Sequence, residues 1–483
     1  MGDSTGDITI VGAGLVGAMA ALALGQRGFK VTVLESMPDI RTLPAYSGRS
    51  INLALSAHGL EGLDLVGMGD EWRERGIPMY SRFIHNADGS TSIQPYGQPG
   101  EHILSVDRRL LNIRLMEEAE KLPNVSFVFN ANVREIDYKK KHLVFEAQEE
   151  ANDGGDGGHS GAQTTSVALR KRSLMERDTD LIVGADGAYS AVRTSLLKSR
   201  RFNYSQEFID HGYKELNMVA VDDDWALAKN HLHIWPRGSF MLIALPNEDK
   251  SFTVTLFMPY AAADGGFNDL DTDEKIEAFM TSNFPDAVPL LGNYVSDFKT
   301  NRTGPLITVK CSRYHYFDSV GMNSSFQDVV KFMALLDEYP FRTARRSLLG
   351  AYSAAQVPSG HAVARIALMN YIEMRSHTAS TLFLLRKRIE GVLHAVLGDV
   401  WRPLYSMVHF TTMPYHMALE RSAKQDRIVA GTVWLLASGA AAGGAWAVAH
   451  FFGSAIASAA TSALTSLNGG VAPKVPRLTW ARL

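Results

Sequence analysis

The feature that most restricts the fold of this chain is a glycine-rich turn near its N-terminus. An apolar run, ITIV at 8–11, leads directly into GAGLVG at 12–17. The Ala-rich stretch AMAALALGQRG follows, and KVTVLE then ends at Glu35. This succession of β-type and helical patterns predicts a strand, a turn, a helix and a second strand. The segment is therefore predicted to form a βαβ unit of a parallel sheet.

The spacing of the turn indicates what it binds. Gly12, Gly14 and Gly17 form G-x-G-x-x-G, in which backbone N–H groups and the helix dipole can meet a pyrophosphate. Glu35 lies 21 residues after Gly14, where a carboxylate can accept the ribose hydroxyls of a dinucleotide. An acidic residue there disfavours a 2′-phosphate, so the dinucleotide should be FAD or NAD. The alternative is a turn that is tight for packing reasons alone.

A second turn distinguishes between these two dinucleotides. In LIVGADGAYSAVR at 181–193, a buried strand pattern leads into an Asp-Gly turn at Asp186, with Arg193 seven residues later. This stretch resembles the DG motif of single-component flavoprotein hydroxylases, in which the Asp lies near the FAD pyrophosphate and the route of NADPH. An NAD-only dehydrogenase has no need of it, so FAD is favoured. The alternative is an ordinary strand-to-helix turn.

Length and pattern suggest how the chain is divided. With 483 residues and 46% hydrophobic content, it can form two or more packed units. We predict an α/β fold with a Rossmann-like FAD-binding domain (about 1–80, 100–200 and 300–345), an interleaved antiparallel β-sheet substrate domain (about 80–100 and 200–300), a helical part (346–425) and a tail (426–483). The polar, Gly-rich residues 149–175 are predicted to be a disordered insertion.

The composition gives no indication of a nucleic-acid partner or of a metal site. The formal net charge is −3 and the pI is near 6.6, so nucleic acid is not an expected partner, and no metal-type spacing is present. The single cysteine, Cys311, cannot form an intrachain disulfide, which fits a reducing compartment, and we expect it to be a buried thiol.

The C-terminal tail has an unusual composition. Residues 428–473 contain no Asp, Glu, Lys or Arg. A helix that spans the hydrocarbon core needs about 20 apolar residues, so the sequence predicts a membrane-anchoring tail. A buried Ala-rich helix and a helix lying on the membrane surface are the alternatives. Basic residues on both sides of the stretch leave its orientation open.

Beyond these motifs, the chain resembles the single-component FAD-dependent aromatic hydroxylases along nearly its whole length, and in particular those that act on L-kynurenine. The matching stretches are IVGAGLVGAMAAL, GRSINLALS (48–56), GIPMYSRFIH (76–85), PYG (95–97), ILSVDRRLLN (103–112), GMN (321–323), NYIEMRSHT (370–378) and PLYSMVHF (403–410). The resemblance implies that NADPH reduces FAD and that O₂ then supplies one oxygen atom to L-kynurenine, ortho to its aromatic amine. It also implies a role in tryptophan degradation and NAD synthesis, and a location at the mitochondrial outer membrane.

The resemblance also implies roles for substrate-site residues. Kynurenine carries an α-carboxylate, for which a planar guanidinium gives the best bidentate grip. Arg82 matches the family's carboxylate anchor, while Tyr96 and Tyr405 match its phenol donors. Asn370 matches the residue that holds the substrate's polar end from the other side. Glu373 shares a helix face with Asn370 and is predicted to act in the catalytic site by orienting the amine or a water. The alternatives are surface ion pairs for Arg82 and Glu373, and core-edge positions for the tyrosines.

For the cofactor, the resemblance and the glycine pattern together assign ten residues. They are Gly12, Gly14, Val16, Gly17, Glu35, Ala54, Arg108, Asp186, Met322 and Asn323. No protein nucleophile is expected, because the amine already activates the ortho carbon and the flavin supplies the electrophilic oxygen.

One part of the family pattern is missing between Val320 and Gly321. In the family, a strand entering GDAAH, a proline-containing loop and an FGQ segment separate YHY from GMN. Loss of a strand from a parallel sheet leaves ladder groups unpaired, which costs several kcal/mol against a total stability of about 5 to 15. We therefore expect poor folding, weak FAD binding and little hydroxylation. Two alternatives stay open: a hydroxylase of another aromatic substrate, and a catalytically silent membrane-attached remnant.

Overall fold

The computed structural model describes residues 6–44, 52–148, 172–197, 202–262, 265–322, 326–376, 381–432 and 434. The contacts divide the chain into a unit of residues 1–420 and a unit of residues 421–483. The predicted cofactor residue Asn323 and most of the predicted tail lie outside the described residues. Within the described part, no helix has the length and apolarity required to cross a membrane.

A six-stranded sheet contains the N-terminal βαβ unit. Its strands, in spatial order, are β18 (His315–Tyr316), β19 (Ser319–Gly321), β12 (Leu181–Gly184), β1 (Asp7–Val11), β2 (Lys30–Leu34) and β8 (Val125–Val128). β1 pairs in parallel with β2 and with β12. The connecting helix α1 (Leu15–Gln26) is buried over nine consecutive residues, as expected for a helix packed against a largely apolar parallel sheet. The prediction of a βαβ unit is confirmed.

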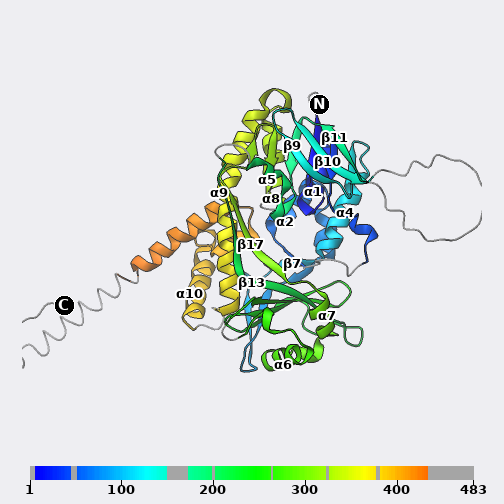
Figure 1. The fold of residues 1–483 in the computed structure, drawn as a ribbon. Helices are drawn as coiled ribbons and strands as arrows, with labels where there is room; N and C mark the ends of the chain where they lie inside the picture. The colour runs from blue at the N-terminus through cyan, green and yellow to red at the C-terminus, as the bar shows by residue number, and fades with distance from the viewer. Residues whose placement is uncertain are drawn as a thin grey trace, which may run out of the picture. The chain divides into compact units, whose positions relative to one another are not determined.

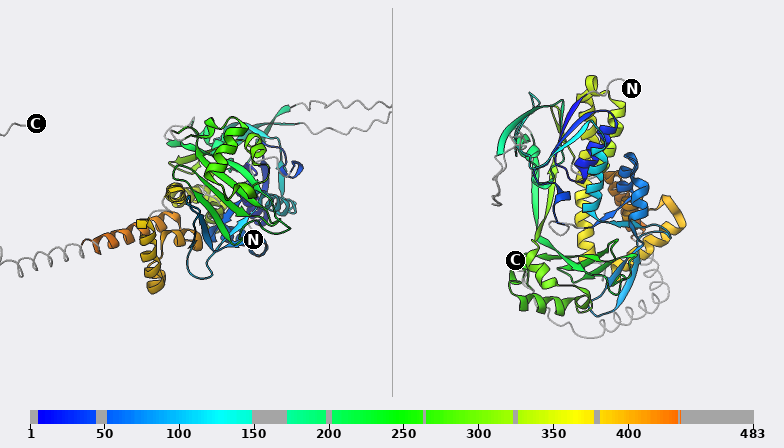
Figure 2. Two further views of the ribbon diagram at one scale, coloured as in Figure 1. Left: turned by 90° about the horizontal axis from the view of Figure 1, so that it is seen from below. Right: turned by 90° about the vertical axis from the view of Figure 1, so that its right-hand side faces the viewer.

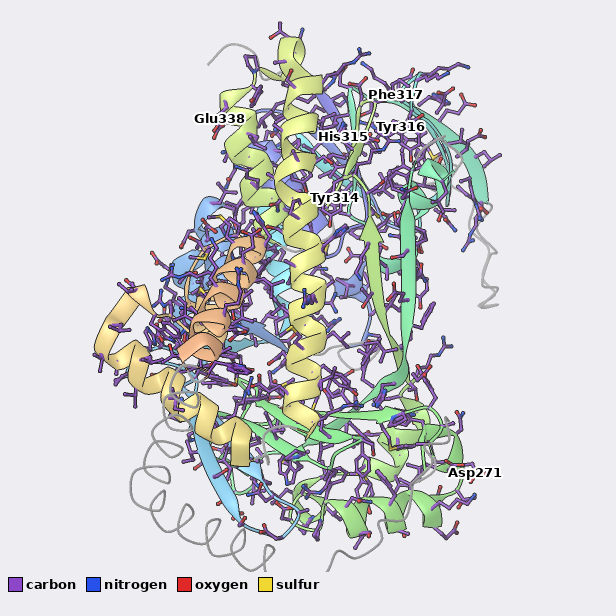
Figure 3. All side chains as sticks on the ribbon, turned by 90° about the vertical axis from the view of Figure 1, so that its left-hand side faces the viewer. Asp271, Tyr314, His315, Tyr316, Phe317 and Glu338 are labelled. Carbon is purple, nitrogen blue, oxygen red and sulfur yellow. The ribbon has the colours of Figure 1, made fainter. Side chains whose placement is uncertain are left out.

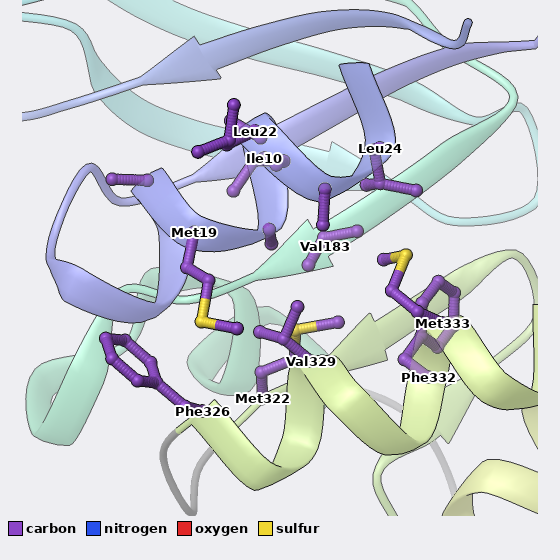
Figure 4. Close-up of a cluster of buried hydrophobic side chains, with 14 of the residues drawn as sticks. Ile10, Met19, Leu22, Leu24, Val183, Met322, Phe326, Val329, Phe332 and Met333 are labelled. Carbon is purple, nitrogen blue, oxygen red and sulfur yellow. The ribbon is translucent and has the colours of Figure 1, made fainter. Parts of the chain in front are cut away.

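The position in the sheet that the missing segment was expected to leave vacant is occupied. β19 pairs in parallel with β12, with Val320 opposite Val183, and the N–H of Met322 donates to the carbonyl of Gly184 at 2.9 Å. Val320 is 1% exposed. Figure 4 shows Met322 beside Val183, together with Val329, which belongs to the next helix, α8 (Phe326–Glu338). The expectation of unpaired ladder groups was therefore wrong, because Ser319–Gly321, the residues on both sides of the join, form a strand at this position.

A seven-stranded sheet forms the second layer. Its spatial order is β17 (Gly304–Cys311), β13 (Tyr204–Met218), β16 (Phe252–Pro259), β15 (Met241–Pro246), β14 (His231–Pro236), β5 (Ser81–His85) and β6 (Thr91–Pro95). The sheet is antiparallel as predicted, except that β5 runs parallel to β14. Figures 1 and 2 show α6 (Asp273–Asn283) and α7 (Tyr294–Thr300) at the end of this sheet that is far from α1. Cys311, at the end of β17, is buried, as expected.

Two small sheets complete the strands. One is β3 (Leu53–Leu55), β7 (Ile103–Val106) and β4 (Ile77–Met79); the other is β11 (Arg172–Asp178), β10 (His142–Gln148) and β9 (Asn132–Asp137). The predicted insertion 149–175 joins β10 to β11, and residues 149–171 lie outside the described part. Its predicted end was wrong, because residues 172–175 belong to β11 and pair with β10.

The C-terminal part is helical, as predicted. Its main elements are α8, α9 (Phe341–Ser376), α10 (Thr381–Leu397) and α11 (Leu404–Phe410). α9 is 36 residues long and contains Pro358. Figure 3 shows α9 running from the region where His315 is labelled to the seven-stranded sheet. One helix therefore lies beside both major sheets.

Candidate active site

The three glycines of the turn have different surroundings. Gly12 has a φ of +101°, and a Cβ there would lie 2.6 Å from the carbonyl oxygen of Ala185. A Cβ on Gly17 would lie 1.9 Å from the carbonyl oxygen of Gly12. A Cβ on Gly14, which caps the N-terminus of α1, would meet no atom within 4 Å. Gly12 and Gly17 thus allow close packing, while Gly14 leaves space at the positive end of a helix, where a pyrophosphate fits.

Glu35 is held against this turn. Its Oε2 accepts a hydrogen bond from the N–H of Ala13 at 2.7 Å, and its Oε1 accepts one from the N–H of Met37 at 2.8 Å. The side-chain amide of Asn112 donates a hydrogen bond to the backbone carbonyl of the same Ala13 at 3.1 Å. Asn112 was not among the predicted site residues, although it ends the matching stretch ILSVDRRLLN. It belongs to α4 (Arg108–Glu120), four residues after the predicted Arg108.

The second motif, the Asp-Gly turn at Asp186, is stabilised by hydrogen bonds within the turn. The N–H of Val192 donates to Asp186 Oδ2 at 3.1 Å, and Arg193 donates to the carbonyl of Gly187 at 3.1 Å. Burial raises the pKa of Asp186, and hydrogen bonds from Ser190 and nearby backbone N–H groups oppose this. These hydrogen bonds therefore fix the conformation of a loop whose Gly187 lines a cavity beside the glycine turn.

A cavity of about 570 Å³ begins at the glycine turn. Four predicted cofactor residues line it: Gly14, Val16, Arg108 and Met322. Its other walls come from the Asp186 turn, from 306–309 of β17 and from the stretch of α9 between Gly360 and Tyr371. This volume lies within the range of small-molecule and cofactor sites, and the lining is mainly apolar. An aromatic ring system with a pyrophosphate at one end fits this space, so the residues present fit FAD.

The remaining predicted cofactor residues lie elsewhere. Gly12 and Gly17 belong to the turn but are not among the residues that line the cavity, and Glu35 accepts a hydrogen bond from the backbone of Ala13 in the turn. Ala54 is exposed on β3 and does not line the cavity. Its predicted contact with the cofactor stays a prediction.

Arg82 forms the centre of a second cluster. The residue is 2% exposed on β5, which excludes the alternative of a surface ion pair. Its Nη1 donates to Glu373 Oε1 at 2.7 Å, and its Nη2 donates to Asn370 Oδ1 at 2.9 Å. Residues three apart share a face of a helix, so α9 presents both partners to the guanidinium together. The pairing of Arg82 with Glu373 compensates a buried charge.

Two tyrosines cover the guanidinium. The rings of Tyr96 and Tyr405 stack with centroids 5.1 Å apart, and Arg82 Cζ lies 5.9 Å and 5.0 Å from their respective centroids. Burial raises the pKa of Tyr96 to about 12, although Arg82 opposes this. Burial acts to lower the pKa of Arg82, but Tyr405, Glu373 and Tyr96 outweigh it and raise the value. The cluster therefore presents a permanent cation and protonated phenols, which are donors for an anion.

Helix α9 links the cluster to the cavity. Tyr371 lies next to Asn370 in the chain and lines the 570 Å³ cavity. Its hydroxyl is buried. Burial raises its pKa, with Arg375 opposing. Tyr371 was also missed, although it lies inside the matching stretch NYIEMRSHT. One turn of helix thus contributes to the guanidinium cluster and to the wall of the cavity.

Comparison with known proteins places the chain in a family. A family model described as an FAD binding domain matches residues 5–299. Kynurenine 3-monooxygenase of Caenorhabditis elegans is 40% identical over 459 residues, which cover 90% of this chain and 97% of the relative. The enzyme of the same name from Sus scrofa is 38% identical, with 87% of this chain and 88% of the relative covered.

Solved structures share the fold. A 2-methyl-3-hydroxypyridine-5-carboxylic acid oxygenase mutant has a TM-score of 0.59 at 18% identity, covering 77% of this chain and 93% of its own. A p-nitrophenol 4-monooxygenase from Pseudomonas putida has a TM-score of 0.57 at 15% identity, covering 82% and 98%. These likenesses concern the fold alone. The sequence relatives go further: the chain belongs to the kynurenine 3-monooxygenase family of FAD-dependent monooxygenases.

Proposed function

We propose that this chain hydroxylates L-kynurenine to 3-hydroxy-L-kynurenine, with FAD as cofactor and NADPH and O₂ as co-substrates. The observation that carries the proposal is the arrangement of α9, which brings Asn370 and Glu373 to the buried Arg82 while Tyr371 lines the cavity. The guanidinium proposed as the carboxylate anchor therefore contacts the same helix that lines the cavity proposed for the flavin. The names of the sequence relatives favour kynurenine over another aromatic substrate, and an enzyme over a silent remnant.

In the proposed reaction the chain holds the cofactor at one end of the cavity. Gly14 and the N-terminus of α1 would meet the pyrophosphate, Glu35 would meet the ribose, and Val16, Arg108 and Met322 would contact the flavin end. When bound, FAD supplies the redox chemistry, taking a hydride from NADPH and activating O₂.

The substrate is positioned by charge. Arg82, with the phenols of Tyr96 and Tyr405, would bind the α-carboxylate, since a guanidinium and hydroxyl donors complement an anion. Asn370 and Glu373, both on α9, would contact the polar end of the substrate. Glu373 would accept a hydrogen bond from an amine or a water. The ring carbon ortho to the aromatic amine is already activated, so the chain's task is to orient the ring and exclude water.

The test begins with the purified chain. We expect bound flavin and NADPH oxidation that L-kynurenine stimulates, with 3-hydroxy-L-kynurenine as the product identified by mass spectrometry. A protein without flavin after reconstitution would instead agree with the expectation of weak cofactor binding that the missing segment at Val320 and Gly321 raised. Flavin binding with stimulation by a different aromatic acid, but not by kynurenine, would contradict the assigned substrate.

We also propose that residues 428–473 attach the chain to a membrane, the mitochondrial outer membrane being the expected location. The support is the uncharged stretch itself, which exceeds the length of about 20 residues needed for a spanning helix. In fractionated cells, the full chain should sediment with mitochondrial membranes, and a chain ending after Asp426 should not. Equal distribution of the two chains would contradict the proposal.

A further inference from the structure

The Arg82 cluster also contains a histidine, His409, on helix α11. His409 follows Tyr405 by one turn on α11, and the two ring centroids lie 4.1 Å apart. The Nδ1 atom of His409 is buried, and no described residue forms a hydrogen bond with it. Buried polar atoms in folded proteins nearly always have a partner, so this atom indicates a partner that the described chain does not supply.

One more atom in the same cluster shares this property. Arg82 Nε is also buried without a hydrogen-bond partner in the described part of the chain. Arg82 and His409 both lie against the ring of Tyr405: Arg82 Cζ is 5.0 Å from its centroid, and the ring centroids of Tyr405 and His409 are 4.1 Å apart. A small polar ligand at this ring would supply the partner that each of the two atoms lacks.

The charge of the cluster restricts that ligand. Burial lowers the pKa of His409 to about 4, and nearby Arg82 and His58 act in the same direction. His409 is therefore neutral at pH 7, and its Nδ1 can donate or accept according to the tautomer. Arg82 and Tyr96 offer donors for a carboxylate, while a neutral imidazole complements either group of an amino acid without adding charge. A zwitterionic α-amino acid head group meets these conditions.

We propose that His409 is a further substrate-binding residue, whose Nδ1 forms a hydrogen bond with the amino-acid head group beside Arg82. The inference rests on the proposed function, since it concerns how the same substrate is held. A role limited to packing would need only the ring of His409 against Tyr405.

Two substitutions separate these roles. His409→Phe keeps an aromatic ring against Tyr405 and removes the nitrogen, whereas His409→Asn loses the ring and retains an amide atom near the position of Nδ1. His409→Gln places its amide near the position of Nε2 and serves as a control for polarity alone. His142→Asn, on the small sheet of β9 to β11, is the control for the same substitution at a distant site.

The measurement is the Kd of L-kynurenine by calorimetry, together with KM and kcat. We expect His409→Phe to raise Kd and KM about tenfold, which is about 1.4 kcal/mol, with kcat within about twofold. The Kd of His409→Asn should stay within about threefold of that of the unsubstituted chain and should be lower than that of His409→Gln. The comparison of these two variants also tests the inference if His409→Phe does not fold. His142→Asn should change nothing.

Unchanged affinity in His409→Phe would overturn the inference, and so would a loss in His409→Asn as large as in His409→Phe. Failure of the unsubstituted chain to bind kynurenine would instead overturn the proposed function, and this inference with it.

Discussion

At the scale of single residues, the site depends on one buried cation. Arg82 is 2% exposed and makes two hydrogen bonds to α9. A buried guanidinium is tolerated only when it is paired, and Glu373 supplies the pairing charge. The predicted role of Arg82 followed from a motif, whereas its contact with Glu373 joins residues 291 positions apart and could not be seen in the sequence.

The first prediction concerns the shape of this cation. Arg82→Lys keeps the charge but loses the planar fork that reaches Glu373, Asn370 and a carboxylate together. Loss of one charge-assisted hydrogen bond costs about 1.5–3 kcal/mol, so we expect kcat/KM for L-kynurenine to fall by about 10- to 100-fold. Arg73→Lys, at an exposed ion pair with Asp64, is the matched control and should leave the kinetics unchanged. Equal kinetics in both variants would exclude Arg82 as the anchor.

The second prediction concerns pH and stability. Burial lowers the pKa of His233 from 6.5 to about 4, although its hydrogen bond to the carbonyl of Ala228 opposes the shift. The folded state thus holds His233 neutral, while the unfolded chain takes up a proton below pH 6.5. The stabilising contribution is complete above pH 6.5 and is lost as the pH falls toward 4. It amounts to about 3 kcal/mol at most.

Urea unfolding at a series of pH values tests this. The free energy of unfolding of the unsubstituted chain should fall more steeply between pH 6.5 and 4 than that of His233→Gln, which cannot titrate. Parallel curves for the two proteins would show that His233 does not contribute.

At the scale of elements, local pattern predicted what is local. The glycine spacing and the apolar runs predicted β1, α1 and β2, because a parallel strand buried on both faces needs a continuous apolar sequence. Pairing between distant segments was not predictable in this way. β5 runs parallel to β14, about 150 residues later, and β19 fills the sheet position that the missing segment was expected to leave vacant.

The third prediction compares two glycines of one turn. Gly17→Ala would bring a Cβ within 1.9 Å of the Gly12 carbonyl oxygen, so we expect the fold to lose about 1–3 kcal/mol with or without flavin. Gly14→Ala meets no atom within 4 Å and has an ordinary φ of −68°, so the flavin-free protein should melt unchanged. Its methyl group would occupy the space proposed for the pyrophosphate, and the flavin content should fall. Full flavin content in Gly14→Ala would contradict that position for the cofactor.

At the scale of the whole molecule, the candidate site depends on α9. The helix passes beside both major sheets and joins the cavity at the glycine turn to the Arg82 cluster. The motifs indicated the members of the Arg82 cluster and four residues of the cavity wall. They did not indicate Asn112 or Tyr371, because a hydrogen bond to a backbone carbonyl and a position in a cavity wall leave no distinctive sequence pattern.

The most direct test of this account is product formation by the purified chain reconstituted with FAD. With NADPH, O₂ and L-kynurenine, we predict one 3-hydroxy-L-kynurenine for each NADPH oxidised, and strongly reduced product formation in Arg82→Lys. Absence of that product from a protein that holds FAD, or equal product formation in Arg82→Lys, would contradict it.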